Sequence, residues 1–394
     1  MTRRERDRVD ACVVGAGVVG ASAALGLARA GLRVSLIEAH VPPAWDAGSP
    51  DLRVYALAPD ARQLFERLGI WPQVLLGRAQ PYRRMRVWDA AGGGELRFDA
   101  DALGRSELGH IVEHGLLVDR LWRAVERESG IERLCPARLR GLSQDADGVR
   151  VEHDQGSLRA RLLVGADGAS SRVRDLAGIG SRDHDYGQRA LVAYVRTQLP
   201  HQDTAWQRFL PGGPLAFLPC AEGRSSIVWT LPEAEAERLL VADASRFSAE
   251  LTRAFDASLG EVTLDSERRA FPLRRRLAEP MAQDRIALVG DAAHVVHPLA
   301  GQGVNLGLRD VAGLLGLVDR ARDRGTEFDA PEGLRRWARQ RHSDNAVAAH
   351  AFEAIDRLYS SEAPLATLVR GPLLGLAGRV PLLGRALWRR AAGL

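Results

Sequence analysis

The sequence predicts an α/β fold in which a largely parallel, helix-covered sheet carries an inserted antiparallel sheet and is followed by C-terminal helices. Three observations support this prediction. An apolar segment at residues 9–14 leads into a glycine-rich turn and an alanine-rich helical segment. Two further predicted strands, at 158–164 and 285–289, also run into glycine. Between them, residues 189–231 form four strand-like runs separated by Pro and Gly turns, as antiparallel strands do.

The N-terminal turn GAGVVG, residues 15–20, has the glycine spacing of dinucleotide-binding folds. Gly15 permits the tight turn, Gly17 lets backbone amides approach a pyrophosphate, and Gly20 lets the helix pack closely on the strand. Together with Val18, these glycines form the predicted cofactor-binding turn. Glu38 ends the second strand, where an acid accepts hydrogen bonds from the adenosine ribose. This unit predicts a dinucleotide site but does not distinguish NAD from FAD.

The composition limits the chemistry and the partners. All 54 basic residues among the 394 are Arg, which excludes Schiff-base, pyridoxal-phosphate and P-loop lysine chemistry. Charges of both signs are interspersed and the net charge is only +4, so we expect no nucleic-acid binding. The three widely spaced cysteines predict a reducing compartment with neither a disulfide frame nor a metal site. The uncharged stretch 11–28 resembles a targeting segment, but its glycines favour the nucleotide turn.

Two later segments continue the same pattern. GADGASSRVR, residues 165–174, and GDAAHVVHPLAGQGVNLGLRD, residues 290–310, each follow a predicted parallel strand. In the second segment Asp291 lies at the carboxyl end of its strand, where α/β sheets place ligands. A helix then begins near Gly303. Its apolar positions fit one buried face: Val304, Leu308, Val311, Ala312 and Leu315.

These three segments, in this order and at this spacing, resemble the three fingerprints of the single-component FAD-dependent aromatic hydroxylases. Residues 204–219, the pair Val228-Trp229 and residues 51–57 narrow the resemblance to the ubiquinone-biosynthesis hydroxylases of the UbiH type. The resemblance spans nearly the whole chain. It implies FAD as the cofactor and a Rossmann-like FAD-binding domain of the aromatic hydroxylase type.

The resemblance also implies a division of the chain into three parts. A discontinuous FAD-binding domain comprises residues 1–77, 100–180 and 273–330. Residues 78–99 and 181–272 form an inserted antiparallel substrate-binding sheet that covers the flavin. Residues 331–394 form a C-terminal helical region, in which 332–359 is one long helix.

The resemblance assigns cofactor contacts to residues outside the first turn. Gly290 and Asp291 bind the ribityl chain, and Arg53 pairs with the pyrophosphate or braces the moving flavin. Glu113 occupies a position that contacts the nucleotide, whereas His114 stands where the family has Asn, so a contact by that side chain lacks support. Asp167 helps to hold the cofactor or serve the nicotinamide donor, and a purely structural role has similar weight.

The resemblance also gives the start of this helix a part in the reaction itself. Its free amides point toward the flavin ring, where negative charge accumulates. The resemblance places the Pro298 carbonyl opposite the reacting carbon. His297 is either a base or substrate contact, or a structural histidine. The residues of this predicted helix start are Gly301, Gln302, Gly303, Val304 and Asn305.

The aromatic residues Phe209, Phe217 and Trp229 of the middle strands are candidates for an apolar substrate pocket, with core packing as the alternative. In the C-terminal part, residues 363–394 combine apolar residues, three Pro and five Arg. The prolines exclude one continuous spanning helix. This segment either lies on an anionic membrane surface or docks on the protein itself or a neighbouring subunit.

The resemblance thus implies a monooxygenase that hydroxylates the ring of a polyprenylated phenol or quinone precursor in ubiquinone biosynthesis. It uses O2 and NAD(P)H as the donor and proceeds through a C4a-hydroperoxyflavin. Two alternatives remain: a same-fold hydroxylase of a small soluble aromatic compound, and a flavin-binding scaffold of a biosynthetic complex. We expect a cytoplasmic protein, peripheral to the inner membrane, that forms a homo-oligomer or joins a ubiquinone-biosynthesis complex.

Overall fold

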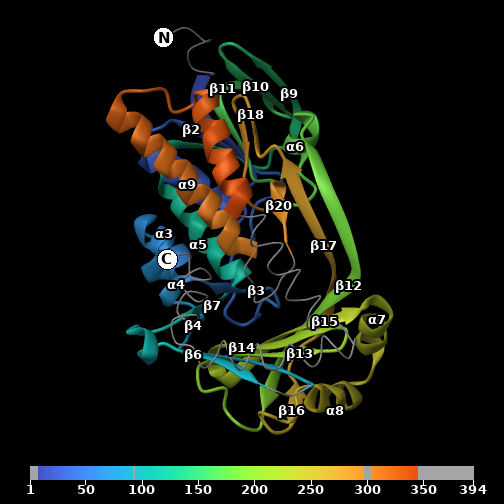
Figure 1. The fold of residues 1–394 in the computed structure, drawn as a ribbon. Coiled ribbons are helices and arrows are strands. Elements are labelled where there is room, and N and C mark those ends of the chain that lie inside the picture. Colours follow the sequence, from blue (N-terminus) through green and yellow to red (C-terminus); the bar gives the residue numbers. More distant parts are fainter. Residues whose placement is uncertain (1–7, 92–93, 297–302, 345–394) are drawn as a thin grey trace.

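The computed structural model describes residues 8–91, 94–296 and 303–344. Figure 1 shows an upper part, in which helices lie against a sheet, and a lower part built on a second sheet. The long strands β12 (Gly180–Thr197) and β17 (Arg269–Glu279) run between the two parts. They pair antiparallel from Gly180–Glu279 to Val192–Arg269, with a register shift between Asp185 and Arg189, so paired strands connect the two parts.

The upper sheet has the order β18-β19-β11-β1-β2-β8, with β10 and β9 added beside β11. Strand β1 lies between β2 and β11 and is parallel to both. Because both its faces are covered, β1 reads as a nearly continuous apolar run. The strands are β1 Arg8–Val14, β2 Val34–Ile37, β8 Ile131–Leu134, β9 Leu139–Asp145, β10 Gly148–His153, β11 Gly156–Gly165, β18 Ala282–Gln283 and β19 Ile286–Leu288.

The helices of the upper part pack closely on this sheet and on each other. A Cβ added at Gly26 would lie 2.5 Å from Leu315 Cδ1, so α2 and α9 touch at a glycine. The expected buried face of α9 is wrong at Ala312, which is exposed, whereas Leu314 is buried. The helices are α2 Val18–Arg29, α3 Pro59–Arg67, α4 Trp71–Leu75, α5 His114–Arg127, α6 Arg172–Leu176 and α9 Gly303–Arg324. Residues 331–344 are also helical, and the rest of the predicted helix 332–359 lies outside the described residues.

A three-stranded sheet, ordered β3-β7-β4, lies beside the cofactor half. Its strands are β3 Val54–Leu57, β4 Ala79–Tyr82 and β7 Gly109–Glu113. Strand β4 lies within the segment expected in the substrate sheet, but it pairs with β7 instead. Strand β7 runs directly into α5, so the residue pair Glu113-His114 forms the junction of the two elements.

The lower sheet has the order β20-β17-β12-β15-β14-β13-β5-β6, with β16 beside β12. Four predicted strand segments, all within 189–231, correspond to β12, β13, β14 and β15. The prediction of a purely antiparallel sheet is wrong at one position, because β13 pairs with β5 in parallel. The other strands are β5 Arg84–Asp89, β6 Glu95–Asp99, β13 Thr204–Leu210, β14 Gly213–Pro219, β15 Arg224–Pro232, β16 Val262–Leu264 and β20 His294–Val295.

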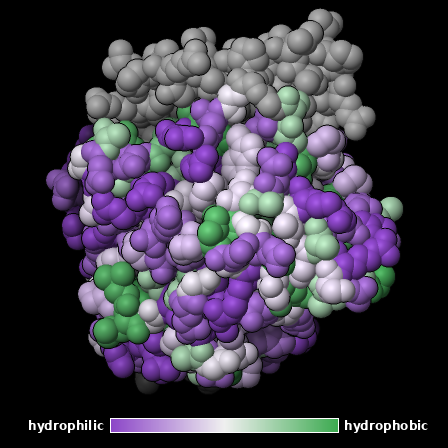
Figure 2. All heavy atoms as spheres, turned by 90° about the horizontal axis from the view of Figure 1, so that it is seen from below, coloured by the Kyte–Doolittle hydropathy of each residue, from purple (hydrophilic) through white to green (hydrophobic). Residues whose placement is uncertain are grey.

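One face of the lower sheet packs against helices α7 (Glu233–Val241) and α8 (Ala244–Ala254). Figure 1 shows α8 below this sheet and α7 at its right-hand edge, beside the lower end of β12. The outer surface seen from below carries mainly hydrophilic side chains with small, separate apolar groups (Figure 2). The opposite face of the sheet is turned toward the upper part, and the candidate site lies between the two.

Candidate functional site

The glycine turn between β1 and α2 is shaped by close backbone contacts. Gly15 has φ +100°, and a Cβ there would lie 2.4 Å from the carbonyl oxygen of Ala166. A Cβ at Gly20 would lie 1.9 Å from the Gly15 carbonyl oxygen. A Cβ at Gly17 would meet nothing within 4 Å, because Gly17 faces an open space. Two glycines thus let the turn and helix pack, and the third leaves room above the helix N-terminus.

The N-terminus of α2 has free amides at this open space. Gly17 is the N-cap and no side chain caps the helix. The first four amides of a helix lack intrahelical acceptors and carry partial positive charge, which suits a phosphate. Glu38 supports the turn from the side, since its carboxylate accepts hydrogen bonds from the backbone amides of Ala16 at 2.6 Å and His40 at 3.0 Å. The ribose contact of Glu38 stays a prediction.

A cavity of about 600 Å³ extends from this turn to the lower sheet. One wall comes from the upper part and contains most of the polar groups. The opposite wall comes mainly from the inner face of the lower sheet and is largely apolar. The residues of the first wall include Gly17, Val18, Arg53, Tyr55, His114, Asp291, Gly303 and Val304. Those of the second include Ala190, Val192, Leu218, Val228, Phe271 and Leu273.

Asp291 reaches this cavity from the turn that follows β19. The preceding residue, Gly290, has φ +59°, and a Cβ there would lie 3.1 Å from Val19 on α2. The Gly290 amide donates to the Asp310 carboxylate of α9 at 3.1 Å. The sequence Gly-Asp is therefore needed here: the glycine makes the turn against α2, and the acid projects into the cavity.

A buried ionic cluster stabilises the turn from behind. Asp310 is fully buried and pairs with His294 at 2.5 Å and with Arg341 at 3.0 Å. Burial alone would raise the pKa of Asp310, but the charges and hydrogen bonds of His294 and Arg341 hold that pKa below its usual range. Because Asp310 also binds the Gly290 amide, this cluster links α9 and the helix at 331–344 to the position of Asp291.

Arg53 lies on the same wall, just before β3. Asp51 fixes the backbone there, since it accepts hydrogen bonds from the Arg53 amide at 2.9 Å and from the Gly115 amide at 3.0 Å. The Arg53 carbonyl accepts from the His114 amide at the start of α5. The guanidinium thus stands on a backbone segment tied to α5, which suits its predicted role beside the pyrophosphate.

Glu113 is buried and lies next to the cavity rather than on its wall. Its carboxylate pairs with Arg78 at 2.5 Å and accepts from the Trp45 indole and the Asp51 amide, both at 3.1 Å. These donors occupy the carboxylate in the described part of the chain, and the contact of Glu113 with the nucleotide stays a prediction. The neighbouring His114 reaches the cavity instead.

Both the NH2 group and the oxygen of the Asn305 side chain bind backbone groups. It donates to the Ala56 carbonyl at 2.8 Å and accepts from the Ala58 amide at 3.0 Å. Its buried side chain therefore joins the start of α9 to β3 and α3. Gly303 and Val304 line the cavity, as the predicted helix start requires. His297, Pro298, Gly301 and Gln302 lie outside the described residues.

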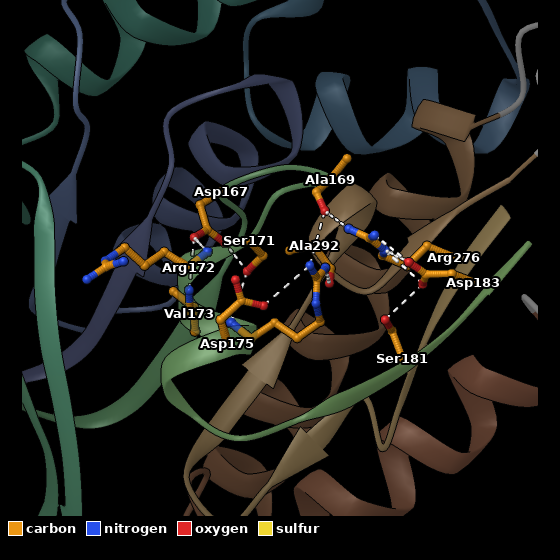
Figure 3. Close-up of polar contacts among 11 residues, drawn as sticks. Asp167, Ala169, Ser171, Arg172, Val173, Asp175, Ser181, Asp183, Arg276 and Ala292 are labelled. Atoms are coloured by element: carbon orange, nitrogen blue, oxygen red, sulfur yellow. Dashed lines mark hydrogen bonds and ion pairs between the residues drawn. The ribbon is translucent and has the colours of Figure 1, made fainter. Parts of the chain in front are cut away.

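Figure 3 shows that the Asp167 carboxylate points to the first turn of α6. It accepts hydrogen bonds from the amides of Arg172 at 2.7 Å and Val173 at 3.0 Å, and from the Ser171 hydroxyl at 2.5 Å. A cap of this kind satisfies helix amides that lack intrahelical acceptors. The geometry favours the structural role of Asp167, whereas its neighbours Ala166 and Gly168 line the cavity.

The predicted substrate pocket requires a correction. Phe217 and Trp229 belong to the core between the lower sheet and α7 and α8, and Phe209 is buried as well. None of the three aromatic residues lines the cavity in the described part of the chain. Successive side chains of a strand point to opposite faces, so the adjacent residues Leu218 and Val228 face the cavity instead.

The sequence also missed two residues of the cofactor-side wall, Tyr55 and His114. The Tyr55 hydroxyl lies 2.9 Å from His114 Nδ1. Burial and the nearby Arg53 lower the pKa of His114 to about 4, so the imidazole is neutral at physiological pH. The unusual His after Glu113 was the available signal. The sequence contains no signal for Tyr55, because its partner His114 is 59 residues away.

Comparison with known proteins agrees with this geometry. The FAD binding domain family matches residues 8–318. The 3-demethoxyubiquinol 3-hydroxylase of Escherichia coli (strain K12) is 37% identical, covering 97% of this chain and 98% of that protein. The ubiquinone hydroxylase UbiL of Rhodospirillum rubrum is 38% identical, covering 98% and 89%. Human COQ6, a mitochondrial ubiquinone biosynthesis monooxygenase, is 31% identical, covering 92% and 87%.

Solved structures share the fold. The p-nitrophenol 4-monooxygenase PnpA of Pseudomonas putida DLL-E4 has a TM-score of 0.78 at 19% identity, covering 98% of this chain and 99% of that chain. A point variant of HpxO from Klebsiella pneumoniae, complexed with FAD, has a TM-score of 0.73 at 21% identity, with the same coverage. The family match and the curated relatives together establish that the chain belongs to the FAD-dependent aromatic monooxygenases, in the group that contains the ubiquinone-biosynthesis hydroxylases.

Proposed function

We propose that this protein hydroxylates the ring of a polyprenylated phenolic precursor of ubiquinone, with FAD, O2 and a nicotinamide donor. The observation that carries the proposal is a cavity with two chemically different walls. The polar wall holds the glycine turn, Arg53 and Asp291. The facing wall is largely apolar. A cavity of this kind accommodates a charged cofactor and an apolar substrate next to each other.

The polar wall fits FAD. The free amides of α2 and the Arg53 guanidinium supply positive partners for a pyrophosphate, and the open space above Gly17 admits it. Asp291 supplies an acceptor for a cofactor hydroxyl. When bound, FAD provides the activation of O2 and the transfer of one oxygen atom to the ring.

The protein's own contribution is to orient the ring and exclude water. Val192, Leu218 and Val228 present an aliphatic surface to the cavity. Such a surface favours an apolar ring and its tail over water, which protects the reactive oxygen from unproductive loss. Phe271 lines the same cavity, yet 49% of its surface is exposed. A partly exposed aromatic residue at the cavity rim suits a prenyl tail that extends beyond the cavity.

The test compares two substrates that differ only in the tail. The purified protein is loaded with FAD, and donor oxidation and hydroxylated product are measured with NADH or NADPH. We expect the prenylated phenol to give hydroxylated product and the tail-less phenol to give much less. Equal turnover of both would instead indicate a hydroxylase of small soluble aromatics. FAD binding without donor oxidation or product, for any phenolic quinone precursor, would indicate a scaffold.

Deletion of the gene identifies the substrate independently. We expect a prenylated quinone precursor that lacks one ring hydroxyl to accumulate, and mass spectrometry of extracted lipids measures it. An unchanged quinone profile would contradict the proposal.

The location and assembly of the protein stay predictions. We infer a cytoplasmic location at the periphery of the inner membrane from the chemistry of the proposed substrate, together with a homo-oligomer or a biosynthetic complex. Among the described residues, no helix is both long and apolar enough to cross a membrane. Residues 363–394, the predicted membrane-contact segment, lie outside the described residues.

A further inference from the structure

Tyr55 of β3 and His114, the first residue of α5, form a hydrogen-bonded pair on the cofactor-side wall of the cavity. The two rings meet edge to face, with centroids 5.7 Å apart and an interplanar angle of 77°. The two residues come from elements held together by the pairing of β3 with β7. The position of the pair is therefore set by the backbone of three elements.

The hydrogen bond has a preferred direction. Burial, followed by the charge of Arg53, lowers the pKa of His114 to about 4, and burial raises the pKa of the Tyr55 hydroxyl. Asp51 and Asp291 also act on the pair, but both rings are neutral at physiological pH. If His114 Nδ1 carried the proton, the Tyr55 hydroxyl hydrogen would need a second acceptor, and none is found in the described part of the chain. Donation from Tyr55 to Nδ1 satisfies both groups and leaves the proton on Nε2.

The His114 Nε2–H has no hydrogen-bond acceptor among residues 8–91, 94–296 and 303–344. The side chain nevertheless lines the cavity, on the same wall as Arg53 and Asp291. His114 is only partly buried, so this N–H faces the cavity and is free to donate to an oxygen of a bound ligand. The nearby Arg53 makes this part of the wall suitable for a hydroxyl or phosphate oxygen.

We infer that Tyr55 is a positioning residue that fixes His114 as the Nε2–H tautomer, and that His114 thereby donates a hydrogen bond to a hydroxyl or phosphate oxygen of the bound dinucleotide. The inference rests on the proposed function in one respect, that the cavity binds FAD. It adds His114 as a specific hydrogen-bond donor, and Tyr55 as a residue that acts only through His114. Neither residue was predicted to take part in the site.

A double-mutant cycle on FAD binding tests the coupling. Apoprotein is titrated with FAD, and the Kd is measured from flavin fluorescence. His114→Ala should raise the Kd about three- to tenfold, the value of one neutral hydrogen bond. His114→Gln is the matched control, because the N–H of its longer amide can reach the position of His114 Nε2 without needing a tautomer, and it should bind more tightly than His114→Ala. Tyr55→Phe should weaken binding about two- to fivefold with His114 present and have little effect in the His114→Ala background.

Two further measurements separate this coupling from a general structural effect. In the wild-type protein, imidazole ¹⁵N chemical shifts should show His114 protonated on Nε2 and not on Nδ1 at neutral pH. Tyr55→Phe should produce a mixture of tautomers. Thermal unfolding identifies any variant whose weaker binding reflects an unfolded fraction, and the comparison of His114→Gln with His114→Ala then carries the test.

The inference is overturned if His114 carries its proton on Nδ1, if His114→Ala binds FAD as tightly as the wild type, or if Tyr55→Phe weakens binding equally in both backgrounds. These readouts do not depend on hydroxylation. Normal FAD binding with the expected coupling but no hydroxylated product would therefore contradict only the proposed function. Absence of FAD binding by the wild-type protein would contradict both.

Discussion

Replacement of Gly17 by Ala separates cofactor binding from folding. The backbone at Gly17 has φ −64° and ψ −178°, which Ala adopts without strain. The added Cβ would meet no protein atom within 4 Å. It would instead enter the cavity above the N-terminus of α2, where the pyrophosphate is expected to approach. The substitution should therefore leave the apoprotein folded and obstruct the cofactor.

The expected changes in stability and in FAD binding follow from where the added methyl group lies in the apoprotein and in the FAD complex. Exchange of Gly for Ala at an N-cap costs about 1 kcal/mol or less in the free energy of unfolding. A hydrogen bond from a backbone amide to a charged phosphate contributes about 1.5–3 kcal/mol. Loss of one such bond raises the Kd for FAD roughly ten- to hundredfold.

Gly20→Ala is the matched control in the same turn. Its Cβ would lie 1.9 Å from the Gly15 carbonyl oxygen and 3.0 Å from the Cβ of Ala166, so the helix must move away from the turn. We expect this overpacking to lower the free energy of unfolding by about 1–3 kcal/mol, even though Ala favours the helix by about 1 kcal/mol.

Urea unfolding of the apoproteins and FAD titration measure the two effects. We expect Gly17→Ala to unfold near the wild-type midpoint and bind FAD at least tenfold more weakly, whereas Gly20→Ala unfolds at lower urea. Tight FAD binding by Gly17→Ala would refute the assignment of the α2 N-terminus to the pyrophosphate.

Four further substitutions test other parts of the account. Phe217→Ala should destabilise the protein by about 3–5 kcal/mol in denaturant unfolding, because Phe217 is fully buried and its ring stacks on that of Phe255 with the centroids 3.9 Å apart. Val228→Trp should instead raise the KM for substrate at near-normal stability, because Val228 lines the cavity. Asp310→Asn should cost about 3–5 kcal/mol at neutral pH by breaking a buried ionic cluster. Since the folded-state pKa of Asp310 is lowered, its stabilisation is present above about pH 4 and is lost as the pH falls through that pKa, so the two proteins should converge in stability at acidic pH. Glu113→Gln should weaken FAD binding indirectly and increase proteolysis of the loop around Trp45, and unchanged cleavage would contradict its positioning role.

The parts predicted well from the sequence are those where local chemistry allows few alternatives. The turn needs Gly15 and Gly20 because backbone atoms lie where a Cβ would be, and Gly17 leaves the space above the helix N-terminus open. The apolar runs of β1 and β11 are buried on both faces, which predicts parallel strands. The Gly290-Asp291 turn against α2 likewise leaves little choice of residue.

The parts that failed depend on contacts between distant segments. Every residue of β14 is buried, so its sequence contains no polar alternation to show that Phe217 faces the core and Leu218 the cavity. The parallel pairing of β13 with β5 joins segments about 120 residues apart. The ion pair of Glu113 with Arg78 could not be predicted either, because Arg78 lies on another segment of the chain.

The central claim is that the cavity brings FAD and a prenylated phenol together for oxygen transfer. The most direct test uses FAD-loaded protein, a nicotinamide donor, the prenylated phenol and ¹⁸O2, with mass spectrometry of the product. The account predicts one ¹⁸O atom in the ring product, and loss of that product when Asp291→Ala removes FAD binding. Donor oxidation that yields only hydrogen peroxide, with no labelled phenol, would contradict it.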